Sequence, residues 1–314
     1  MRAVVIHEPG DASVLQIEER PIPKADATHT VINIKAFGIH RYEVLTRAGG
    51  SPSVKFPRVI GVEAVGEVFE PAANSKFTKG QRVLVINGGF GREFDGSYQE
   101  YALVPDDLLF AVDYDVDWQT LAQYPENFYT AFGALRMTKV QKGQTLLVRG
   151  GTTAVGMAMI GLAKSLGVEV SATTRKPERK QLLLEQGADH VVIDKDNQLQ
   201  TDNKYDGIVD MVGTVSCENS IQHVNRGGVC CMIGLLAGEW VFKEFDPFTL
   251  GGAYLSVFDG GEPSQALFDE IFDLIKRNHL SIPISKTFKL SDIAAAQDYV
   301  MANPQPGQVI VTTE

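Results

Sequence analysis

The sequence predicts an α/β protein in which a doubly wound parallel sheet is inserted into a β-rich domain that forms a partly closed barrel. The chain has 314 residues, more than the roughly 250–300 at which a single hydrophobic core stops growing, so two domains are expected. Short Val- and Ile-rich segments separated by Gly and Pro fill its N-terminal third. From Gln144 onward strand-like and helix-like segments alternate, which is typical of a parallel sheet covered by helices.

The N-terminal segments have the length and composition of β-strands. The expected strands are Ala3–His7, Thr30–Phe37, Val62–Phe69, Arg82–Ile86 and Tyr98–Val104. The Gly and Pro residues between them are turn signals, so the pattern suits a small antiparallel barrel. Apolar residues at helical spacing then run from Asp117 to Arg136.

The central part of the chain reads as a nucleotide-binding sheet. The expected strands are Thr145–Val148, Val168–Thr173, His190–Ile193, Gly207–Met211 and Val229–Ile233, with helices at Ala154–Leu166 and Pro177–Gln186. The C-terminal part returns to mixed content, with helices at Gln265–Arg277 and Ser291–Met301 and a closing strand at Gln308–Thr312. We therefore predict a catalytic domain made of residues 1–122 plus 262–314 and a nucleotide-binding domain of residues 123–261.

Composition and charge restrict the function. Lys and Arg number 29 and Asp and Glu 39, so the net charge is −10, a sign that disfavours nucleic acids and anionic membranes as partners. No apolar run approaches the ~20 residues that span a bilayer, and the N-terminal segment does not read as a signal peptide. Cys217, Cys230 and Cys231 are too few for a four-cysteine zinc site, and their odd number favours reduced thiols. We expect a cytoplasmic protein.

A Gly-rich turn between a strand and a helix is the most specific motif. Gly151-Thr152-Thr153-Ala154-Val155-Gly156 follows a Gly-x-Gly-x-x-Gly pattern in which Thr153 replaces the middle Gly. We expect Gly151 to allow the tight turn and Gly156 to let the helix pack closely on the strand. The helix N-terminus would then present its amides to a pyrophosphate, as in a Rossmann domain. A Gly-rich turn that binds nothing is the alternative, and the surrounding alternation of strands and helices favours dinucleotide binding.

The end of the next strand predicts which dinucleotide binds. A site that prefers NAD usually places Asp or Glu there, to accept hydrogen bonds from the ribose 2′-hydroxyl. Here the strand ends in Thr174-Arg175-Lys176, and Arg179 follows. The tip of the strand has no acid and three cations gather there, which suits the 2′-phosphate of NADPH, because one Arg side chain can bind two phosphate oxygens at once. An exposed basic turn without a ligand is the alternative.

Several motifs in order resemble one family. They are Gly61–Val68 (Gly-x-Glu-x-x-Gly-x-Val), Lys79–Val83, Gly96–Tyr101 (Gly-x-Tyr-x-Glu-Tyr) and Tyr129–Phe132. On these residues the chain resembles a zinc-independent medium-chain dehydrogenase/reductase of the quinone oxidoreductase, or zeta-crystallin-like, branch. The resemblance implies a GroES-like catalytic domain, a Rossmann domain that binds NADPH, and a homodimer.

The same resemblance argues against zinc. Family members with zinc carry Cys and His at two ligand positions that correspond here to His40 and Val62, and Val cannot ligate a metal. Without a Lewis acid, a conjugated acceptor is the better substrate, because it delocalises the incoming electron pair. We therefore predict hydride transfer from NADPH to quinones or α,β-unsaturated carbonyls. An NADPH-binding sensor or scaffold with weak redox activity and an enoyl reductase remain alternatives, whereas a zinc alcohol dehydrogenase lacks the ligands.

The proposed site residues come from position and resemblance. His40, Tyr42 and Tyr129 are candidate proton donors to a carbonyl oxygen, and each could instead serve packing or an internal hydrogen bond. Thr130 is expected on the nicotinamide side of the cofactor. Gly213, Gly234 and Phe258 are expected where strand ends meet the cofactor. Asp194 stands where the family has a Tyr on the 2′-phosphate, and its charge would oppose that phosphate, although the three cations outweigh it.

Overall fold

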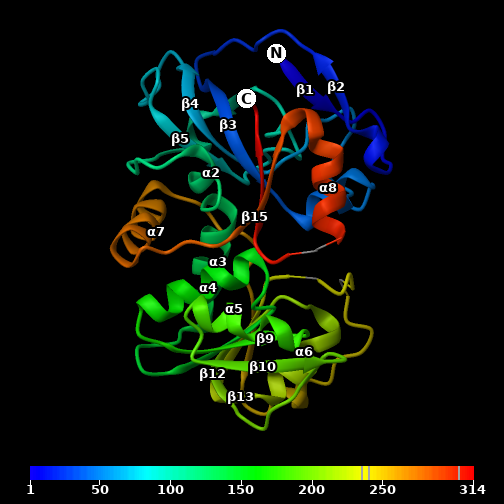
Figure 1. Cartoon of the computed structure of the whole chain (residues 1–314), viewed down its shortest axis with the longest axis vertical. Coiled ribbons are helices and arrows are strands. Elements are labelled where there is room, and N and C mark those ends of the chain that lie inside the picture. Colours follow the sequence, from blue (N-terminus) through cyan, green and yellow to red (C-terminus); the bar gives the residue numbers. More distant parts are fainter. Residues whose placement is uncertain (235, 240, 303–304) are drawn as a thin grey trace. The chain divides into compact units, whose positions relative to one another are not determined.

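The chain folds into two compact units (Figure 1). The structure, a computed structural model, describes residues 1–234, 236–239, 241–302 and 305–314. Unit 1 consists of Met1–Glu126, Pro263–Asp269 and Pro283–Glu314, and unit 2 of Asn127–Glu262 and Glu270–Ile282. The first unit is therefore built from both ends of the chain. Residues 270–282 group with unit 2, whereas the sequence prediction assigned them to the catalytic domain.

Unit 1 is built on a seven-stranded sheet in the order β15-β16-β3-β4-β5-β7, with β6 also paired to β3. Its strands are β3 (His29–Ile39), β4 (Glu63–Glu70), β5 (Arg82–Ile86), β6 (Tyr101–Pro105), β7 (Leu109–Ala111), β15 (Ile284–Lys289) and β16 (Gln308–Thr312). The β15–β16 pair is parallel and the other pairs are antiparallel. A separate two-stranded sheet joins β1 (Arg2–Val5) and β2 (Gln16–Glu19). This is the β-rich unit that the sequence predicts.

Short helices flank this sheet. They are α1 (Arg41–Arg47), α2 (Trp118–Leu121) and α8 (Ile293–Ala302), together with the 3₁₀ turns Ala12–Val14, Asp106–Leu108 and Leu290–Asp292. Helix α1 begins directly after β3, so His40 is its N-cap. Phe37 of β3 stacks on the buried Tyr98 with ring centroids 5.1 Å apart. Phe37 thus anchors the end of β3 in the core, three residues before the N-cap of α1.

Unit 2 is built on a second seven-stranded sheet in the order β11-β10-β9-β8-β12-β13-β14. Its strands are β8 (Thr145–Arg149), β9 (Glu169–Thr174), β10 (His190–Lys195), β11 (Gln198–Leu199), β12 (Tyr205–Asp210), β13 (Val224–Met232) and β14 (Tyr254–Val257). All pairs are parallel except β10–β11. From β8 the chain adds β9 and then β10 on one side of β8, and it then returns to place β12 on the other side of β8. The predicted doubly wound sheet is confirmed.

Helices precede, connect and follow the strands of this sheet. They are α3 (Pro125–Thr138), α4 (Ala154–Ser165), α5 (Lys180–Glu185), α6 (Thr214–Gln222) and α7 (Gln265–Asn278), with 3₁₀ turns at Pro177–Arg179 and Pro247–Leu250. Of these, α4, α5 and α6 are the ones that lie between its parallel strands. Helix α4 packs on β8 and β9, whereas α6 packs on β12 and β13. The order reverses between β8 and β12, and ligands of such sheets bind at the carboxyl ends of the strands at that point. None of the described helices is long and apolar enough to cross a membrane.

Candidate functional site

The Gly-rich turn joins β8 to α4 through a threonine cap. Thr153 is the N-cap of α4, and its Oγ1 donates to the Gly150 carbonyl and accepts from the Gly156 amide, both at 2.9 Å. The residue of the turn with a positive φ is Gly150, at +100°. Gly151 is needed for another reason, since a Cβ there would lie 2.9 Å from the Ala172 Cβ on β9. Gly156 admits close packing as predicted, because its Cβ would lie 2.4 Å from the Gly150 oxygen.

The start of α4 fits a pyrophosphate. The amides of Ala154 and Val155 have no acceptor within the described residues, as expected for the first turn of a helix. These free donors and the positive end of the helix dipole favour an anion at this position. The turn therefore keeps the chemistry of a dinucleotide site although Thr replaces its middle Gly.

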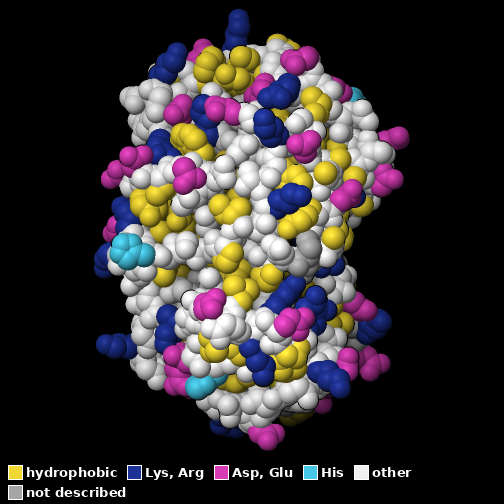
Figure 2. Space-filling model, in the orientation of Figure 1, with side chains coloured by type: hydrophobic (Ala, Val, Ile, Leu, Met, Phe, Trp, Pro, Cys, Tyr) yellow, Lys and Arg dark blue, Asp and Glu magenta, His cyan; other side chains and the backbone are white. Residues whose placement is uncertain are grey.

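The end of β9 carries cations without ion partners. Arg175 and Lys176 are exposed and Arg179 is half-buried, and none of them forms an ion pair with another described residue. The Thr174 hydroxyl holds the turn by donating to the Lys176 carbonyl and accepting from its amide, both at 3.1 Å. Figure 2 shows Lys and Arg side chains gathered on unit 2 near the place where β9 is labelled in Figure 1. The three guanidinium and ammonium groups are thus free to meet a ligand.

Three other predicted cofactor residues, Gly213, Gly234 and Phe258, follow the carboxyl ends of β12, β13 and β14. Gly213, with φ of +116°, precedes α6, and its amide donates to Asp210 Oδ1 at 3.2 Å. Gly234 follows β13 and packs against the end of β12: a Cβ on Gly234 would lie 2.7 Å from the backbone oxygen of Met211. The Phe258 amide donates to the Met232 carbonyl at 3.3 Å. Thr130 lies on α3 and is half-buried.

The side chain of Tyr129 contacts other residues of unit 2. Its ring packs against Phe258 with centroids 5.8 Å apart, and its hydroxyl donates to the Gly260 carbonyl. The side chain is 1% exposed. These contacts describe a residue that fastens the segment after β14, and its role as a proton donor stays a prediction.

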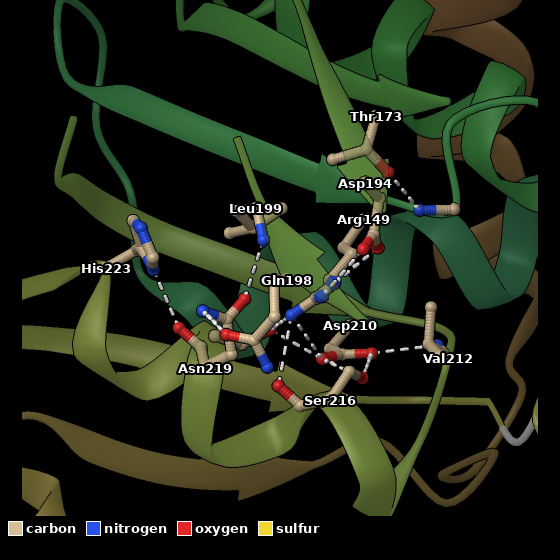
Figure 3. Close-up of polar contacts among 12 residues, drawn as sticks. Arg149, Thr173, Asp194, Gln198, Leu199, Asp210, Val212, Ser216, Asn219 and His223 are labelled. Carbon is tan, nitrogen blue, oxygen red and sulfur yellow. Dashed lines mark hydrogen bonds and ion pairs between the residues drawn. The ribbon is translucent and has the colours of Figure 1, made fainter. Parts of the chain in front are cut away.

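Asp194 is neutralised by a residue that the sequence analysis did not select. Arg149, the last residue of β8, donates from Nε to Asp194 Oδ2 at 2.7 Å and from Nη2 to Oδ1 at 3.0 Å (Figure 3). From the sequence, the charge of Asp194 was expected to oppose the 2′-phosphate. In the structure this carboxylate is 5% exposed and is bound at both oxygens.

In unit 1 the predicted donor His40 is held by a buried carboxylate. The His40 Nε2 lies 2.7 Å from Glu63 Oε1, and the other Glu63 oxygen accepts the Glu126 amide at 2.6 Å. Glu43 accepts the His40 amide at 2.8 Å and the Val62 amide at 3.1 Å. His40 and both glutamates are buried. The ring is therefore fixed in position by its backbone and its side chain.

The electrostatics keep a proton on His40. Burial acts to lower the pKa of His40, but the charges of Glu63, Glu43 and Glu126 outweigh it and raise the pKa to about 9. Burial raises the pKa of Glu43 to about 7, against the opposing effect of the nearby His40 charge. An imidazolium at neutral pH is a group that can donate a proton.

Tyr42 packs beside the same histidine. Its ring stacks on His40 with centroids 5.5 Å apart and an angle of 8° between the planes, and the Arg92 guanidinium lies 5.6 Å from its centre. Burial, followed by the charges of Glu126, Glu43 and Glu63, raises the pKa of Tyr42 well above its usual value. The structure therefore brings two of the three predicted donors together and keeps the Tyr42 hydroxyl protonated.

Metal ligands are not grouped in the described part of the chain. No set of three or more His, Cys, Asp or Glu residues there is arranged to hold a metal ion. At the position where zinc members carry a ligand, Val62 contributes only its backbone amide, which Glu43 binds.

Two family models match the chain. The model of the alcohol dehydrogenase GroES-like domain matches residues 26–114, and that of the zinc-binding dehydrogenase matches residues 186–311. The chain belongs to the medium-chain dehydrogenase/reductase family. It is therefore an oxidoreductase with the family's nicotinamide-dinucleotide-binding fold.

Relatives of the chain in this family are quinone oxidoreductases. A quinone oxidoreductase of Pongo abelii is 28% identical over 247 residues, covering 74% of this chain and 73% of the relative. One of Pseudomonas aeruginosa is 25% identical over 318 residues, covering 96% of each. The chain is thus similar to the quinone oxidoreductases of this family, the branch that its sequence motifs resemble.

Solved structures share the fold over nearly the whole chain. A quinone oxidoreductase from Coxiella burnetii superposes with a TM-score of 0.88 at 22% identity, covering 100% of this chain and 99% of the other. A mycobacterial protein complexed with NADPH superposes with a TM-score of 0.86 at 24% identity, covering 99% of both chains.

Glu43, Glu63 and Arg149 are not among the site residues predicted from the sequence. Glu63 stood inside the Gly-x-Glu motif of this medium-chain dehydrogenase/reductase, and Glu43 follows its N-cap by three residues, the spacing of a capping box. Both signals were available. The signal for Arg149 was weaker: it is a cation at the end of a strand whose other residues suit burial.

Proposed function

We propose that this protein reduces quinones or α,β-unsaturated carbonyl compounds with NADPH. The observation that carries the proposal is the basic turn after β9, where Arg175, Lys176 and Arg179 have no ion partner among the described residues and outnumber the single acid of the turn, Glu178. A 2′-phosphate carries close to two negative charges, and unpaired Arg side chains are the groups that bind it best. The relatives named above, which are quinone oxidoreductases, support the class of acceptor.

A proton source in unit 1 supports the same reaction. The bound nucleotide would supply the hydride, and reduction of a quinone to a hydroquinone consumes one hydride and one proton. We propose that His40 provides that proton, because its imidazolium is stabilised by Glu63 at 2.7 Å and by the nearby Glu43. Tyr42 would fix the plane of the imidazole by stacking on it.

The proposed mechanism uses no metal. A conjugated acceptor spreads the incoming charge, so one hydrogen-bond donor can take the place of a Lewis acid. Treatment with a chelator should leave turnover unchanged, and a requirement for added zinc would contradict this part of the proposal.

Nucleotide binding and turnover test the function separately. Fluorescence titration should give a lower Kd for NADPH than for NADH. The loss of NADPH absorbance should follow addition of 1,4-benzoquinone, 9,10-phenanthrenequinone or an enone. Tight binding of NADPH without turnover of any acceptor would favour a sensor or scaffold instead, and turnover of enoyl thioesters alone would favour an enoyl reductase.

A further inference from the structure

Arg149 forms a buried polar cluster at the carboxyl edge of the unit 2 sheet (Figure 3). Its side chain is 0% exposed. Besides both oxygens of Asp194, it donates from Nη1 to the Ser216 carbonyl at 3.0 Å and to the Ser220 hydroxyl at 2.9 Å. Arg149 therefore ties the ends of β8 and β10 to the first turns of α6.

The second acid of the cluster is satisfied largely by hydrogen bonds. Asp210 Oδ1 accepts the amides of Val212 at 2.8 Å and Gly213 at 3.2 Å. The hydroxyls of Ser216 and Ser220 donate to Asp210 Oδ2 at 2.8 Å and 2.6 Å. Arg149 Nη1 stays 3.9 Å from that carboxylate. The main ion partner of Arg149 is thus Asp194.

The strand register puts this pair beside the basic turn. Ile193 of β10 is the partner of Thr174 on β9. The next residue along each parallel chain is Asp194 on one and Arg175 on the other. Neighbouring strands lie ~4.8 Å apart, so Asp194 borders the start of the turn that holds the unpaired cations.

Stability does not by itself explain such a pair. Burying two charges costs most of what their attraction returns, and well-packed apolar residues are often as stable in their place. A buried charge near a ligand site is also less screened by salt than one at the surface. An unpaired Asp194 would act against a phosphate on the adjacent turn.

We propose that Arg149 is a specificity-determining residue that allows this edge to bind a 2′-phosphate by offsetting the charge of Asp194. The inference rests on the proposed use of NADPH. Arg149 itself need not contact the nucleotide. Its effect is electrostatic: the Arg149–Asp194 pair is neutral, so Arg175, Lys176 and Arg179 act on the phosphate without opposition from Asp194.

Charge-changing variants test the inference through the ratio of the Kd for NADH to the Kd for NADPH. Asp194→Asn should raise this ratio about threefold to tenfold, because it removes a negative charge near the phosphate. Arg149→Met should lower it by a similar factor. The double variant Arg149→Met/Asp194→Asn, which removes both charges, should return the ratio to within about twofold of the parent protein.

Asp189→Asn is the matched control. It makes the same chemical change just before the other end of β10, where Asp189 pairs with Lys164 at 2.7 Å. Five residues of strand separate it from Asp194 by ~17 Å, beyond the Debye length at physiological salt. Its ratio should equal that of the parent protein.

The outcomes separate the inference from the proposed function. An unchanged ratio in Asp194→Asn, or a double variant that keeps a tenfold lowered ratio, would overturn the role of charge compensation. If Arg149→Met does not fold, Asp194→Asn and the double variant still decide the question. A parent protein without preference for NADPH would refute the cofactor assignment alone, and a ratio that still rises in Asp194→Asn would support the inference.

Discussion

His40 and Glu63 form a buried pair in which Nε2 lies 2.7 Å from Oε1, with side chains 9% and 1% exposed. Glu63 lies at the first position of β4, and His40 is the N-cap that ends β3 and begins α1. Glu63 pairs with Ile86 of β5, and His40 directly follows β3, which pairs with β4, so both backbone positions are set by strands of the same sheet.

The buried pair predicts how stability depends on pH. The pKa of His40 is raised from 6.5 to about 9 and that of Glu43 from 4.5 to about 7. The folded protein therefore binds more protons than the unfolded chain, and the free energy of unfolding falls as the pH rises, from about 4.5 to 7 for Glu43 and from 6.5 to 9 for His40. Thermal unfolding between pH 6.5 and 9 should show a smaller loss of Tm in His40→Gln than in the parent protein. Equal losses would contradict the raised pKa.

The proton donor can be tested by rate and by pH profile. His40→Gln retains a hydrogen-bond donor for Glu63 but has no titrating proton, so kcat with a quinone should fall about 100-fold. In the parent protein kcat/KM should decline above pH 9, where His40 loses its proton, and this limb should be absent from the variant. A loss of tenfold or less would mean that His40 only positions the substrate. Tyr42→Phe and Tyr129→Phe should lose much less activity, and a larger loss in either would move the donor to that tyrosine.

Local patterns predicted the sheets well because hydrophobic periodicity and Gly-rich turns are local properties. The strand Arg82–Ile86 agrees with β5 residue for residue, and the helix expected at Ala154–Leu166 agrees with α4 to within one residue. The helix expected over Asp117–Arg136 is two helices, α2 and α3. Pro125 begins the second one, and a proline disfavours helical geometry in the residue before it.

Side-chain pairing was beyond the reach of sequence reasoning. Asp194 and Arg149 are 45 positions apart, and β9 lies between their strands. Nothing in either local sequence indicates the partner. The strands β7 and β11 were missed since they have only three and two residues, too few to show a period of two.

The basic turn after β9 should determine cofactor preference. Arg175→Ala/Arg179→Ala removes two unpaired guanidinium groups and should erase most of the preference for NADPH, while the Kd for NADH changes little. Fluorescence titration of both nucleotides measures the effect. Lys204→Ala, which removes an exposed cation before the amino end of β12, is the control and should leave both Kd values unchanged. A preserved ratio in the double variant would contradict the assignment of NADPH.

Thr153 should contribute stability as a helix cap. Thr153→Ala removes the acceptor of the Gly156 amide and should lower the free energy of unfolding by about 1 kcal/mol. Thr153→Gly, which restores the usual Gly of the pattern, should cost only a few tenths of a kcal/mol, because Gly is itself tolerated at N-caps. Urea denaturation of the three proteins measures the order. If Thr153→Ala leaves the free energy of unfolding unchanged, the side-chain cap has no energetic role.

The open edge of the unit 2 sheet predicts self-association. Strand β14 pairs only with β13 among the described residues, and Tyr254 and Val257 on it are 64% and 59% exposed. A bare edge with exposed apolar side chains is prone to pairing with another chain, so we expect a homodimer through β14. Val257→Lys places a charge on this edge and should shift light scattering from the dimer to the monomer mass. Leu184→Lys, a similar change at a 44% exposed residue of α5, should leave the dimer intact. A parent protein that is monomeric at micromolar concentration would contradict the prediction.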